Sequence, residues 1–371
     1  MNARVQLKDI ASFSKGEQIN GENLIEDGVY PYLNGGIQPS GRWTACNAPG
    51  NTITISEGGN SCGYVNLMTE PFWCGAHCYY LYDLSVDVQY LYFALKSQQA
   101  RLMGIRTGAC MPNIKKNDLG CFDLTIHTGI AEQKRIVQQL LLCQTVIEQR
   151  QRQLCAIDTL IKARFVEMFG DPVINDRGWQ QITLLESLEA GRTVTYGIVQ
   201  TGDEFDNGTP VFRPIDIAGG HVPKREELKK TDPLISAQYK RTLLKGNELL
   251  ITVRGSVGET FQTTDEFEGC NVGRNIVPLV TDSNKVLQRF LQELFAQDAI
   301  KSWLKGITKG IALQGLNMGE FKEMPVIMPP IALQRVFVGF ASQVDKSKVV
   351  VQKALDEAQI LFDSLMQKYF G

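Results

Sequence analysis

The stretch that decides the fold is IAEQKRIVQQLL (residues 130–141), because the chain repeats it in altered form as IALQRVFVGFAS (residues 331–342). Residues 130–169 contain neither Gly nor Pro and run into FGDP, where Gly170 suits a left-handed helix cap and Pro172 prevents further helix. We therefore predict one long helix over residues 130–169. The second copy of the same helix start predicts a partner helix 201 residues later.

The two predicted helices carry the same apolar ladder. Apolar residues recur at alternating spacings of three and four, the seam pattern of a coiled coil, and adding 201 to each position finds the ladder again. At about 1.5 Å per residue, each helix spans roughly 60 Å. A seam needs a partner surface, so we predict an antiparallel coiled coil with pseudo-twofold symmetry and a globular unit at each end. The predicted seam residues are Ile136, Leu140, Ile147, Leu154, Ile157, Ile161, Phe337, Val344, Val351, Leu355, Phe362 and Leu365.

The doubling extends upstream of the helices. GNTITISEGGNSCGYV (residues 50–65) resembles GNELLITVRGSVGETF (246–261), and each reads as an alternating strand that enters a Gly-rich turn. Weaker matches pair PYLNGGIQPSG (31–41) with PVFRPIDIAGG (210–220), and QLKDIASFSKG (6–16) with QITLLESLEAG (181–191). The offset grows from 175 through 179 and 196 to 201. This growth indicates two α+β domains with mixed sheets that diverged by loop insertion, while the helices kept their length.

Composition sets broad limits on the function. The chain has 371 residues, 43% of them hydrophobic, which is enough for two or three domains with cores of their own. No stretch approaches the roughly 18 uninterrupted apolar residues of a membrane span, and the start MNARVQLKDI lacks the apolar core of a signal peptide. We predict a cytoplasmic protein without membrane contact. The formal charge of −2 gives no sign of a nucleic-acid partner, since isolated nucleic-acid-binding domains are usually basic.

The sequence lacks the common motifs of catalysis and cofactor binding. It has no GxxxxGK[ST] phosphate loop, no GxGxxG after a strand and no Asn-Pro-Pro-aromatic motif of an amino-methyltransferase. Cys74, His77 and Cys78 could join Cys46 and Cys62 in a metal site, but no CxxC pair supports one. We predict buried or idle reduced thiols and no metal. The chain reads as a binding protein without catalytic residues.

Almost the whole chain resembles the specificity subunit of type I restriction-modification systems. Two variable domains are each followed by a long helix with an Ile-Ala-x-Gln-basic entrance, preceded by GACMPNIKKNDLGCFDLTIHTGIAEQKRIV (residues 108–137) and GIALQGLNMGEFKEMPVIMPPIALQRVF (310–337). The first copy departs from the family pattern with His127, Thr128 and Gly129, where prolines are common. The resemblance implies recognition domains over residues 1–127 and 171–328, and spacer helices over residues 128–170 and 329–371.

The resemblance also implies a division of labour. Each recognition domain would read one half of a bipartite, asymmetric site in double-stranded DNA, and the paired helices would set the unread gap. The helices would also dock two methyltransferase (modification) subunits, which bring S-adenosylmethionine. Restriction/translocase subunits would bring ATP and Mg. This chain itself would hold no cofactor, and partner subunits would supply much of the phosphate attraction that its charge lacks.

Base readout needs Arg, Lys, Asn, Gln or Ser/Thr side chains on loops that can enter a groove. Arg254 and Arg274 are the leading candidates because adjacent glycines permit close approach of the backbone. Glu57 and Asp216 could read cytosine, although surface solvation is the stronger expectation. Gln139, Arg152 and Gln153 are expected to point outward from the helices. The full set of predicted DNA-binding residues is Asn34, Gln38, Arg42, Asn60, Arg106, Asn113, Lys115, Lys116, Arg192, Tyr196, Arg213, Arg254, Ser256, Arg274, Asn275, Lys309 and Gln314.

Two alternatives stay open at this point. The chain could be the recognition portion of a combined restriction-methylation enzyme, in which case magnesium-dependent cleavage by the purified chain would reveal it. It could also be an orphan coiled-coil scaffold, which would fail to bind duplex DNA even beside a methyltransferase.

Overall fold

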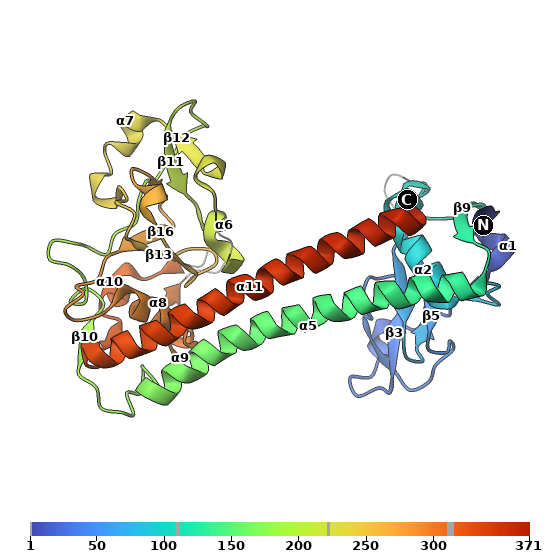
Figure 1. Cartoon of the computed structure of the whole chain (residues 1–371), viewed down its shortest axis with the longest axis horizontal. Helices are drawn as coiled ribbons and strands as arrows, with labels where there is room; N and C mark the ends of the chain where they lie inside the picture. Colours follow the sequence, from blue (N-terminus) through green and yellow to red (C-terminus); the bar gives the residue numbers. More distant parts are fainter. Residues whose placement is uncertain (1, 109–111, 221–222, 310–314) are drawn as a thin grey trace. The chain divides into compact units, whose positions relative to one another are not determined.

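The computed structural model describes residues 2–108, 112–220, 223–309 and 315–371. It divides into two compact units, which we describe separately. Unit 1 comprises Met1–Arg152 with Gln352–Gly371, and unit 2 comprises Gln153–Val351. The long helices α5 (Ile130–Phe169) and α11 (Ile331–Phe370) each have 40 residues and run from one unit into the other (Figure 1). Within the described residues, no helix combines the length and the apolar character that a membrane crossing needs.

The described part of unit 1 contains antiparallel strand pairs and the parallel pair β3–β7. The main sheet has the order β2-β8-β5-β6, a second has β4-β3-β7, and β1 pairs with β9. Only β3 and β7 run parallel among the pairs just named. The elements are β1 (Asn2–Gln6), α1 (Leu7–Ile10), β2 (Ser12–Lys15), β3 (Tyr30–Leu33), β4 (Gly41–Trp43), β5 (Thr52–Ser56), β6 (Val65–Met68), β7 (Trp73–Cys74), β8 (Cys78–Tyr82), α2 (Val88–Ser97), α3 (Gln99–Gly104), α4 (Lys116–Gly120) and β9 (Asp123–His127).

Unit 2 repeats this plan with different loop lengths. Its sheets have the orders β14-β13-β16, β12-β11-β15, β10-β19 and β17-β18, and β11 runs parallel to β15. The elements are β10 (Gln181–Thr183), β11 (Thr209–Phe212), α6 (Pro214–Ile217), β12 (Lys229–Thr231), α7 (Pro233–Ser236), β13 (Leu249–Thr252), β14 (Thr260–Gln262), β15 (Asn271–Val272), β16 (Ile276–Leu279), α8 (Gln288–Ala296), α9 (Asp298–Gly306), β17 (Thr308–Lys309), β18 (Gly315–Leu316), α10 (Met318–Lys322) and β19 (Pro325–Ile327).

The internal repeat holds at the level of single hydrogen bonds. The Ile114 N–H donates to Glu57 O at 2.9 Å in unit 1, and the Leu316 N–H donates to Val253 O at 2.9 Å in unit 2. The parallel pair β3–β7 in unit 1 likewise corresponds to β11–β15 in unit 2. The predicted fold class is therefore confirmed: an α+β repeat with mixed sheets and a pair of long helices.

The predicted match of Gln6 with Gln181 is wrong by two residues. The Gln6 N–H donates to the Asp9 carboxylate at 3.1 Å, and in unit 2 the equivalent bond runs from the Thr183 N–H to Glu186 at 2.8 Å. Gln6 therefore corresponds to Thr183. A further insertion follows this strand in unit 2, so that the glycine equivalent to Gly16 is Gly197.

Close backbone packing identifies this glycine pair. A Cβ atom placed at Gly16 would lie 1.8 Å from Cys74 O, and one at Gly197 would lie 1.8 Å from Val272 O. Any side chain at either position would force the backbone apart. The sequence match with Gly191 was misleading because Gly191 meets no atom within 4 Å and serves a turn instead.

The repeated glutamine of the helix entrance explains why the chain carries this motif twice. Gln133 accepts a hydrogen bond from the Asp87 N–H at 2.9 Å and donates to His127 O at 2.6 Å. Gln334 accepts from the Leu287 N–H at 2.9 Å and donates to Pro329 O at 2.8 Å. Both glutamines are buried. Each side chain therefore joins the first turn of a long helix to the start of the short helix, α2 or α8, that packs beside it.

Replacing Gln334 by Ala is expected to lower the free energy of unfolding of unit 2 by about 1–3 kcal/mol, because the part-buried Leu287 N–H and the buried Pro329 carbonyl lose their partner. Urea unfolding followed by circular dichroism measures the change. The matched control is Gln343→Ala on the exposed side of α11, also in unit 2, which should change stability by no more than about 0.5 kcal/mol. Equal effects of the two substitutions would contradict this account of the motif.

The long helices pack antiparallel in each unit. In unit 1, Tyr369 of α11 donates to Gln139 of α5 at 2.6 Å, and in unit 2 Lys348 of α11 pairs with Asp158 of α5 at 2.7 Å. The first contact shows that Gln139 faces the partner helix, so its predicted outward orientation is wrong. All predicted seam residues are buried or half-buried: Ile136, Leu140, Ile147, Leu355, Phe362 and Leu365 in unit 1, and Leu154, Ile157, Ile161, Phe337, Val344 and Val351 in unit 2.

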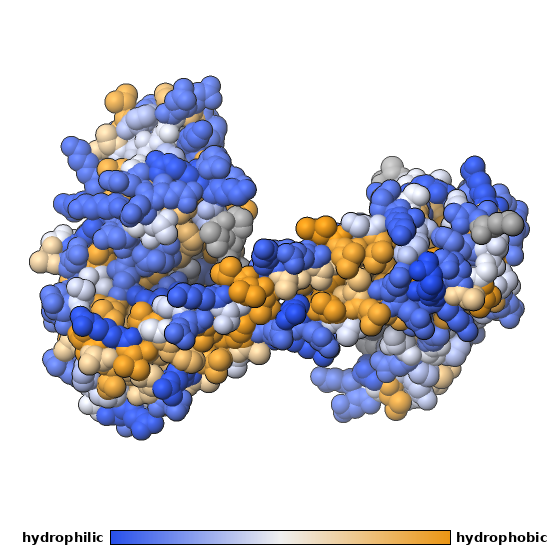
Figure 2. Space-filling view, viewed as in Figure 1, coloured by the Kyte–Doolittle hydropathy of each residue, from blue (hydrophilic) through white to orange (hydrophobic). Residues whose placement is uncertain are grey.

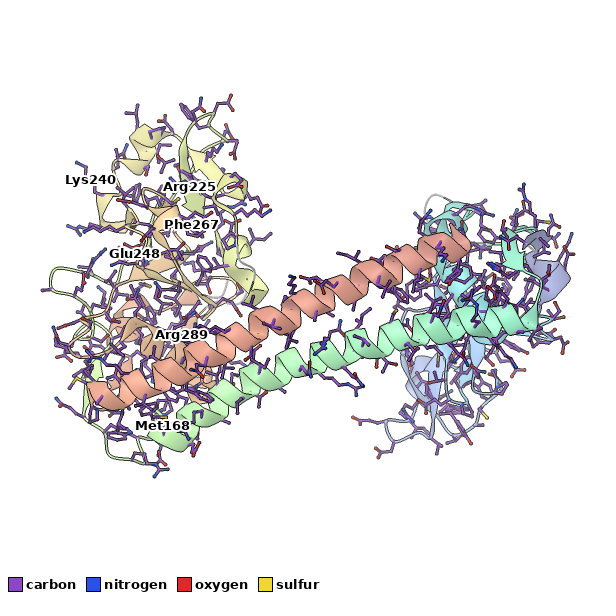
Figure 3. The ribbon with its side chains drawn as sticks, in the orientation of Figure 1. Met168, Arg225, Lys240, Glu248, Phe267 and Arg289 are labelled. Carbon is purple, nitrogen blue, oxygen red and sulfur yellow. The ribbon has the colours of Figure 1, made fainter. Side chains whose placement is uncertain are left out.

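Charged side chains attach the helix pair to the globular part of unit 2. Arg289 of α8, labelled in Figure 3, pairs with Glu293 at 2.6 Å and with Asp345 of α11 at 3.0 Å. Burial raises the pKa of Glu293, and the positive charge of Arg289 opposes that rise. Because one arginine serves carboxylates on two helices, this network orients α8 against α11.

Candidate nucleic-acid interface

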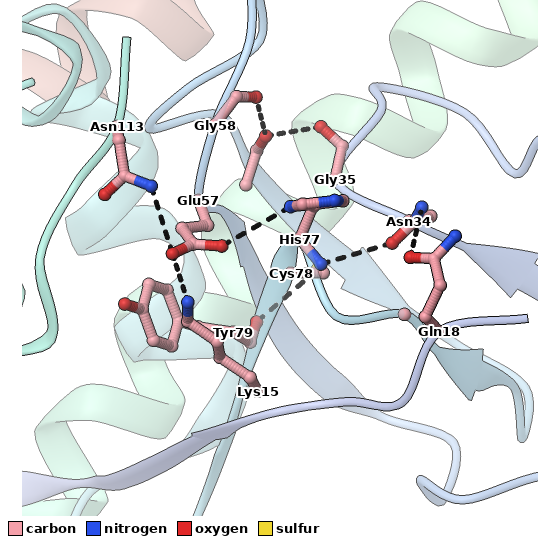
Figure 4. Close-up of polar contacts among 12 residues, drawn as sticks. Lys15, Gln18, Asn34, Gly35, Glu57, Gly58, His77, Cys78, Tyr79 and Asn113 are labelled. Carbon is pink, nitrogen blue, oxygen red and sulfur yellow. Dashed lines mark hydrogen bonds and ion pairs between the residues drawn. The ribbon is translucent and has the colours of Figure 1, made fainter. Parts of the chain in front are cut away.

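One edge of the main sheet of unit 1 collects polar side chains from separate strands. Strands β2 and β5 end at this edge and β8 begins there, since Lys15 lies opposite Tyr79 and Ser56 lies opposite Cys78. Antiparallel neighbours place the end of one strand beside the start of the next. Lys15, Glu57 and His77 therefore meet, as Figure 4 shows.

Glu57 is at the centre of this edge. Glu57 is only 5% exposed. Its carboxylate contacts Lys15 Nζ, Asn113 Nδ2 at 3.1 Å and His77 Nδ1 at 3.7 Å. The side chains of Lys15 and His77 are 46% and 64% exposed. Burial, together with the negative charge of Glu57, raises the pKa of nearby Tyr79 to about 12. This edge of the sheet therefore holds a buried carboxylate, and the donor groups of Lys15 and His77 around it reach the surface.

Neighbouring loops are tied to the same edge. Asn34 accepts from the His77 N–H at 3.2 Å and donates to Gln18 Oε1 at 3.1 Å. The hydroxyls of Ser56 and Ser61 both donate to Gly35 O. The loop after β3 and the turn after β5 are therefore held together by hydrogen bonds, which makes a defined polar surface from several chain segments.

Unit 2 builds the equivalent edge with other side chains. The Val253 N–H donates to Asn275 O at 2.8 Å, which corresponds to the bond from the Glu57 N–H to His77 O at 2.9 Å. Arg254 forms a β-bridge with Gly315 and is exposed. The side-chain oxygen Oδ1 of Asn275 is buried and has no hydrogen-bond partner among the described residues. Tyr196, beside Gly197, is 42% exposed at the same edge.

The structure brings together a subset of the predicted DNA-binding residues. Most of these residues lie on the turn after the central strand, on the segment before the next strand, or on the loop that pairs with that turn, whereas Asn34 follows β3 and Tyr196 precedes Gly197. They are Asn34, Asn60, Arg106 and Asn113 in unit 1, and Tyr196, Arg254, Ser256, Arg274 and Asn275 in unit 2. Gln38, Lys115 and Lys116 are exposed on adjoining loops or at the start of α4.

Other predicted residues are engaged within the protein. Arg42 donates to Gly28 O and Val29 O, each at 2.5 Å. The guanidinium group of Arg213 makes two hydrogen bonds to Asp216, at 3.2 and 2.8 Å, and this pairing raises the pKa of Arg213.

Two further candidates also have internal partners, and one cannot be placed. Arg192 lies 3.7 Å from the buried Glu248, which precedes β13 and therefore marks the opposite edge of the sheet. Lys309 pairs with Glu320 at 3.2 Å. Gln314 lies outside the described residues.

The expectation for the two acidic residues is wrong. Glu57 and Asp216 are both buried and hydrogen-bonded to cationic side chains, so neither is solvated at the surface. Sequence reasoning also missed Lys15 and His77. Tyr196 was predicted to bind DNA, and Lys15 is its equivalent in unit 1. Matching Gly16 with Gly197, and not with Gly191, would have identified Lys15 as a candidate.

The cysteines considered above for a metal site differ in their exposure. Cys62, Cys74 and Cys78 are buried, whereas Cys46 is exposed. Burial raises the pKa of the Cys62 thiol, and the positive charge of Arg106 opposes this shift. In the part of the chain that the structure describes, no group of three His, Cys, Asp or Glu residues is arranged to hold a metal ion.

The two repeats match a known family. The model of the type I restriction modification DNA specificity domain matches residues 2–153 and 178–358. The chain belongs to this family. The two matched segments correspond to the two halves of the repeat, each with its strand-edge site and most of its long helix.

Individual family members show the same relation. A putative type I specificity subunit of Mycoplasma pneumoniae is 37% identical over 137 residues, which is 36% of this chain and 36% of that protein. The EcoBI type I restriction enzyme specificity subunit of Escherichia coli is 26% identical over 209 residues, which is 55% of this chain and 44% of that protein. The chain therefore matches less than half the length of these curated relatives.

A solved structure shares the fold of the whole chain. The crystal structure of the type I restriction-modification system S subunit from M. genitalium aligns with a TM-score of 0.62 at 22% identity, and covers 100% of this chain and 96% of that one. This likeness supports the fold assignment, including the paired long helices.

Proposed function

We propose that this chain is a non-catalytic DNA-specificity subunit of a type I restriction-modification complex. In this proposal, residues 1–127 and 171–328 each read one half of a bipartite, asymmetric DNA site. Residues 128–170 and 329–371 form the paired helices that set the gap. The observation that carries the proposal is the repeat of one strand-edge scaffold with different side chains: Lys15, Glu57 and His77 in unit 1 correspond to Tyr196, Val253 and Asn275 in unit 2.

This substitution pattern fits a reader of two different half-sites. Matched backbone hydrogen bonds hold the two edges in the same geometry, so that each can approach a groove in the same manner. Because the side chains at the edges differ in charge and hydrogen-bonding capacity, they select different base patterns. Identical edges would instead read a symmetric site.

The exposed faces of the long helices support the docking of partner subunits. Large apolar side chains lie exposed on these helices, and Figure 2 shows them as orange patches along both. Such patches mark interaction surfaces. They would dock two methyltransferase subunits, which carry S-adenosylmethionine, while restriction/translocase subunits bring ATP and Mg. The exposed residues are Ile130, Leu142, Val146, Leu160 and Val166 on α5, and Leu333, Val336, Val349, Val350, Ile360 and Leu361 on α11.

Methylation sequencing of a host that expresses this chain with its methyltransferase tests the proposal. The matched control expresses the methyltransferase with the chain deleted. We expect a methylated bipartite motif, with two defined halves separated by a fixed number of unread bases, that disappears in the control. A methylation pattern that does not depend on the chain would contradict the proposal.

A further inference from the structure

The buried carboxylate of Glu57 is a feature that the fold does not require. A carboxylate is costly to bury unless cationic or hydrogen-bonding partners surround it. The equivalent residue in unit 2 is Val253, which is 2% exposed and keeps the same two backbone hydrogen bonds. An apolar side chain therefore satisfies this position in the same scaffold. Because the fold does not need the carboxylate, its role lies with the side chains that contact it.

Those groups come from three separate segments and all reach the edge of the sheet. Lys15 ends β2, His77 precedes β8, and Asn113 lies on the segment that forms β-bridges with Gly58 and Thr107. A lysine side chain is flexible and carries about 2 kcal/mol of rotamer entropy. An ion pair with a fixed carboxylate holds the ammonium group in one place before any ligand arrives, which lowers the cost of binding.

We propose that Lys15 and Asn113 read bases in the first DNA half-site and that Glu57 is the residue that positions them. The inference rests on the proposed function. Lys15 has further ammonium protons to donate toward guanine O6 and N7 in the major groove, the commonest specific contact of this side chain. Asn113 donates from Nδ2 to Glu57, so its Oδ1 is left to accept a hydrogen bond from a base amino group. The first half-site therefore contains a guanine whose recognition depends on Lys15.

His77 lies on the rim of this cluster. Its side chain is exposed, and its backbone N–H is held by Asn34. This position suits a contact with the DNA backbone, which fixes register without reading sequence. His77→Ala should therefore lower methylation at all sites without altering the motif.

The experiment is methylation sequencing of the assembled complex with variants of this chain. Lys15→Ala should lower the discrimination for one guanine in one half-site by about tenfold or more, and leave the other half-site intact. Glu57→Gln should relax the same base position. The double variant should change that position no more than Lys15→Ala alone, because Glu57 acts through Lys15 there. Lys8→Ala, an exposed lysine of α1, is the matched control and should change nothing.

The outcomes separate this inference from the proposed function. An unchanged motif for Lys15→Ala and Glu57→Gln overturns the inference but leaves the specificity role intact. Equal loss at every position of both half-sites also overturns it, because that result indicates a folding defect. Absence of any chain-dependent motif with the unaltered protein overturns the proposed function and the inference with it.

Discussion

Phe337→Ala is expected to destabilise unit 2 by about 3–5 kcal/mol, the range for a fully buried phenylalanine that leaves a cavity. Phe337 of α11 is completely buried, and its ring lies 5.4 Å from that of Phe165, 5.5 Å from that of Phe169 and 6.3 Å from that of Phe290. These rings belong to α5, α8 and α11. The substitution thus removes the side chain that fills the junction of both long helices with the globular part of the unit.

Trp179 is a built-in reporter for this measurement. Its ring lies 6.4 Å from Phe169, and its indole N–H donates to Phe169 O at 2.9 Å. Urea unfolding followed by the fluorescence of Trp179, with the chain's other three tryptophans replaced by phenylalanine, therefore reports on the cluster. The matched control is Val336→Ala, next to Phe337 but 57% exposed, and it should cost less than about 0.5 kcal/mol. A loss below about 1 kcal/mol for Phe337→Ala would show that the cluster is not a structural centre of the unit.

The long helices could be predicted from sequence because their signals are local. A seam of alternating three and four spacings, the absence of Gly and Pro and a closing Phe-Gly all lie within the segment that forms the helix. The role of Gln133 and Gln334 was different. Their repetition was visible, but their partners, Asp87 and Leu287, lie more than 40 residues upstream. Only the folded chain shows why both entrances carry glutamine.

The candidate site was predicted in part, for a related reason. Residues next to a glycine, such as Arg254 and Arg274, could be predicted at the edge because a strand followed by a turn is a local pattern. The burial of Glu57 depends on Lys15, 42 residues away, and no local pattern reports it. The occupied guanidinium groups of Arg42 and Arg213 show the same limit. Composition marks a cationic residue as a possible base reader, but tertiary hydrogen bonds decide which of its donors are left for a base.

Insertion of seven residues after Gln151 in α5, and of seven after Gln352 in α11, is expected to lengthen the unread gap of the DNA motif by about three base pairs. Seven residues add one heptad, so the seam stays in register while each helix gains about 10 Å. DNA rises about 3.4 Å per base pair. Gln151 and Gln352 are equivalent positions in the repeat and both are exposed. Methylation sequencing reads the new gap directly.

Insertion into one helix alone is the matched control. It would shift half of the seam against its partner, so that Lys348 could no longer meet Asp158 while Tyr369 still met Gln139. Methylation should then be lost. The paired insertion preserves both contacts, and neither half-site should change because no residue of the strand edges is altered.

In this experiment, the extent of methylation reports how well both half-sites are engaged, and the methylated motif reports the length of the gap. Three added base pairs also turn the second half-site by about a third of a turn around the duplex, since one turn takes about 10.5 base pairs. Lower methylation is therefore expected even if the spacer has lengthened. The length of the gap decides the matter: a gap that stays constant while both half-sites remain methylated would show that the helices hold the subunits together without measuring the DNA.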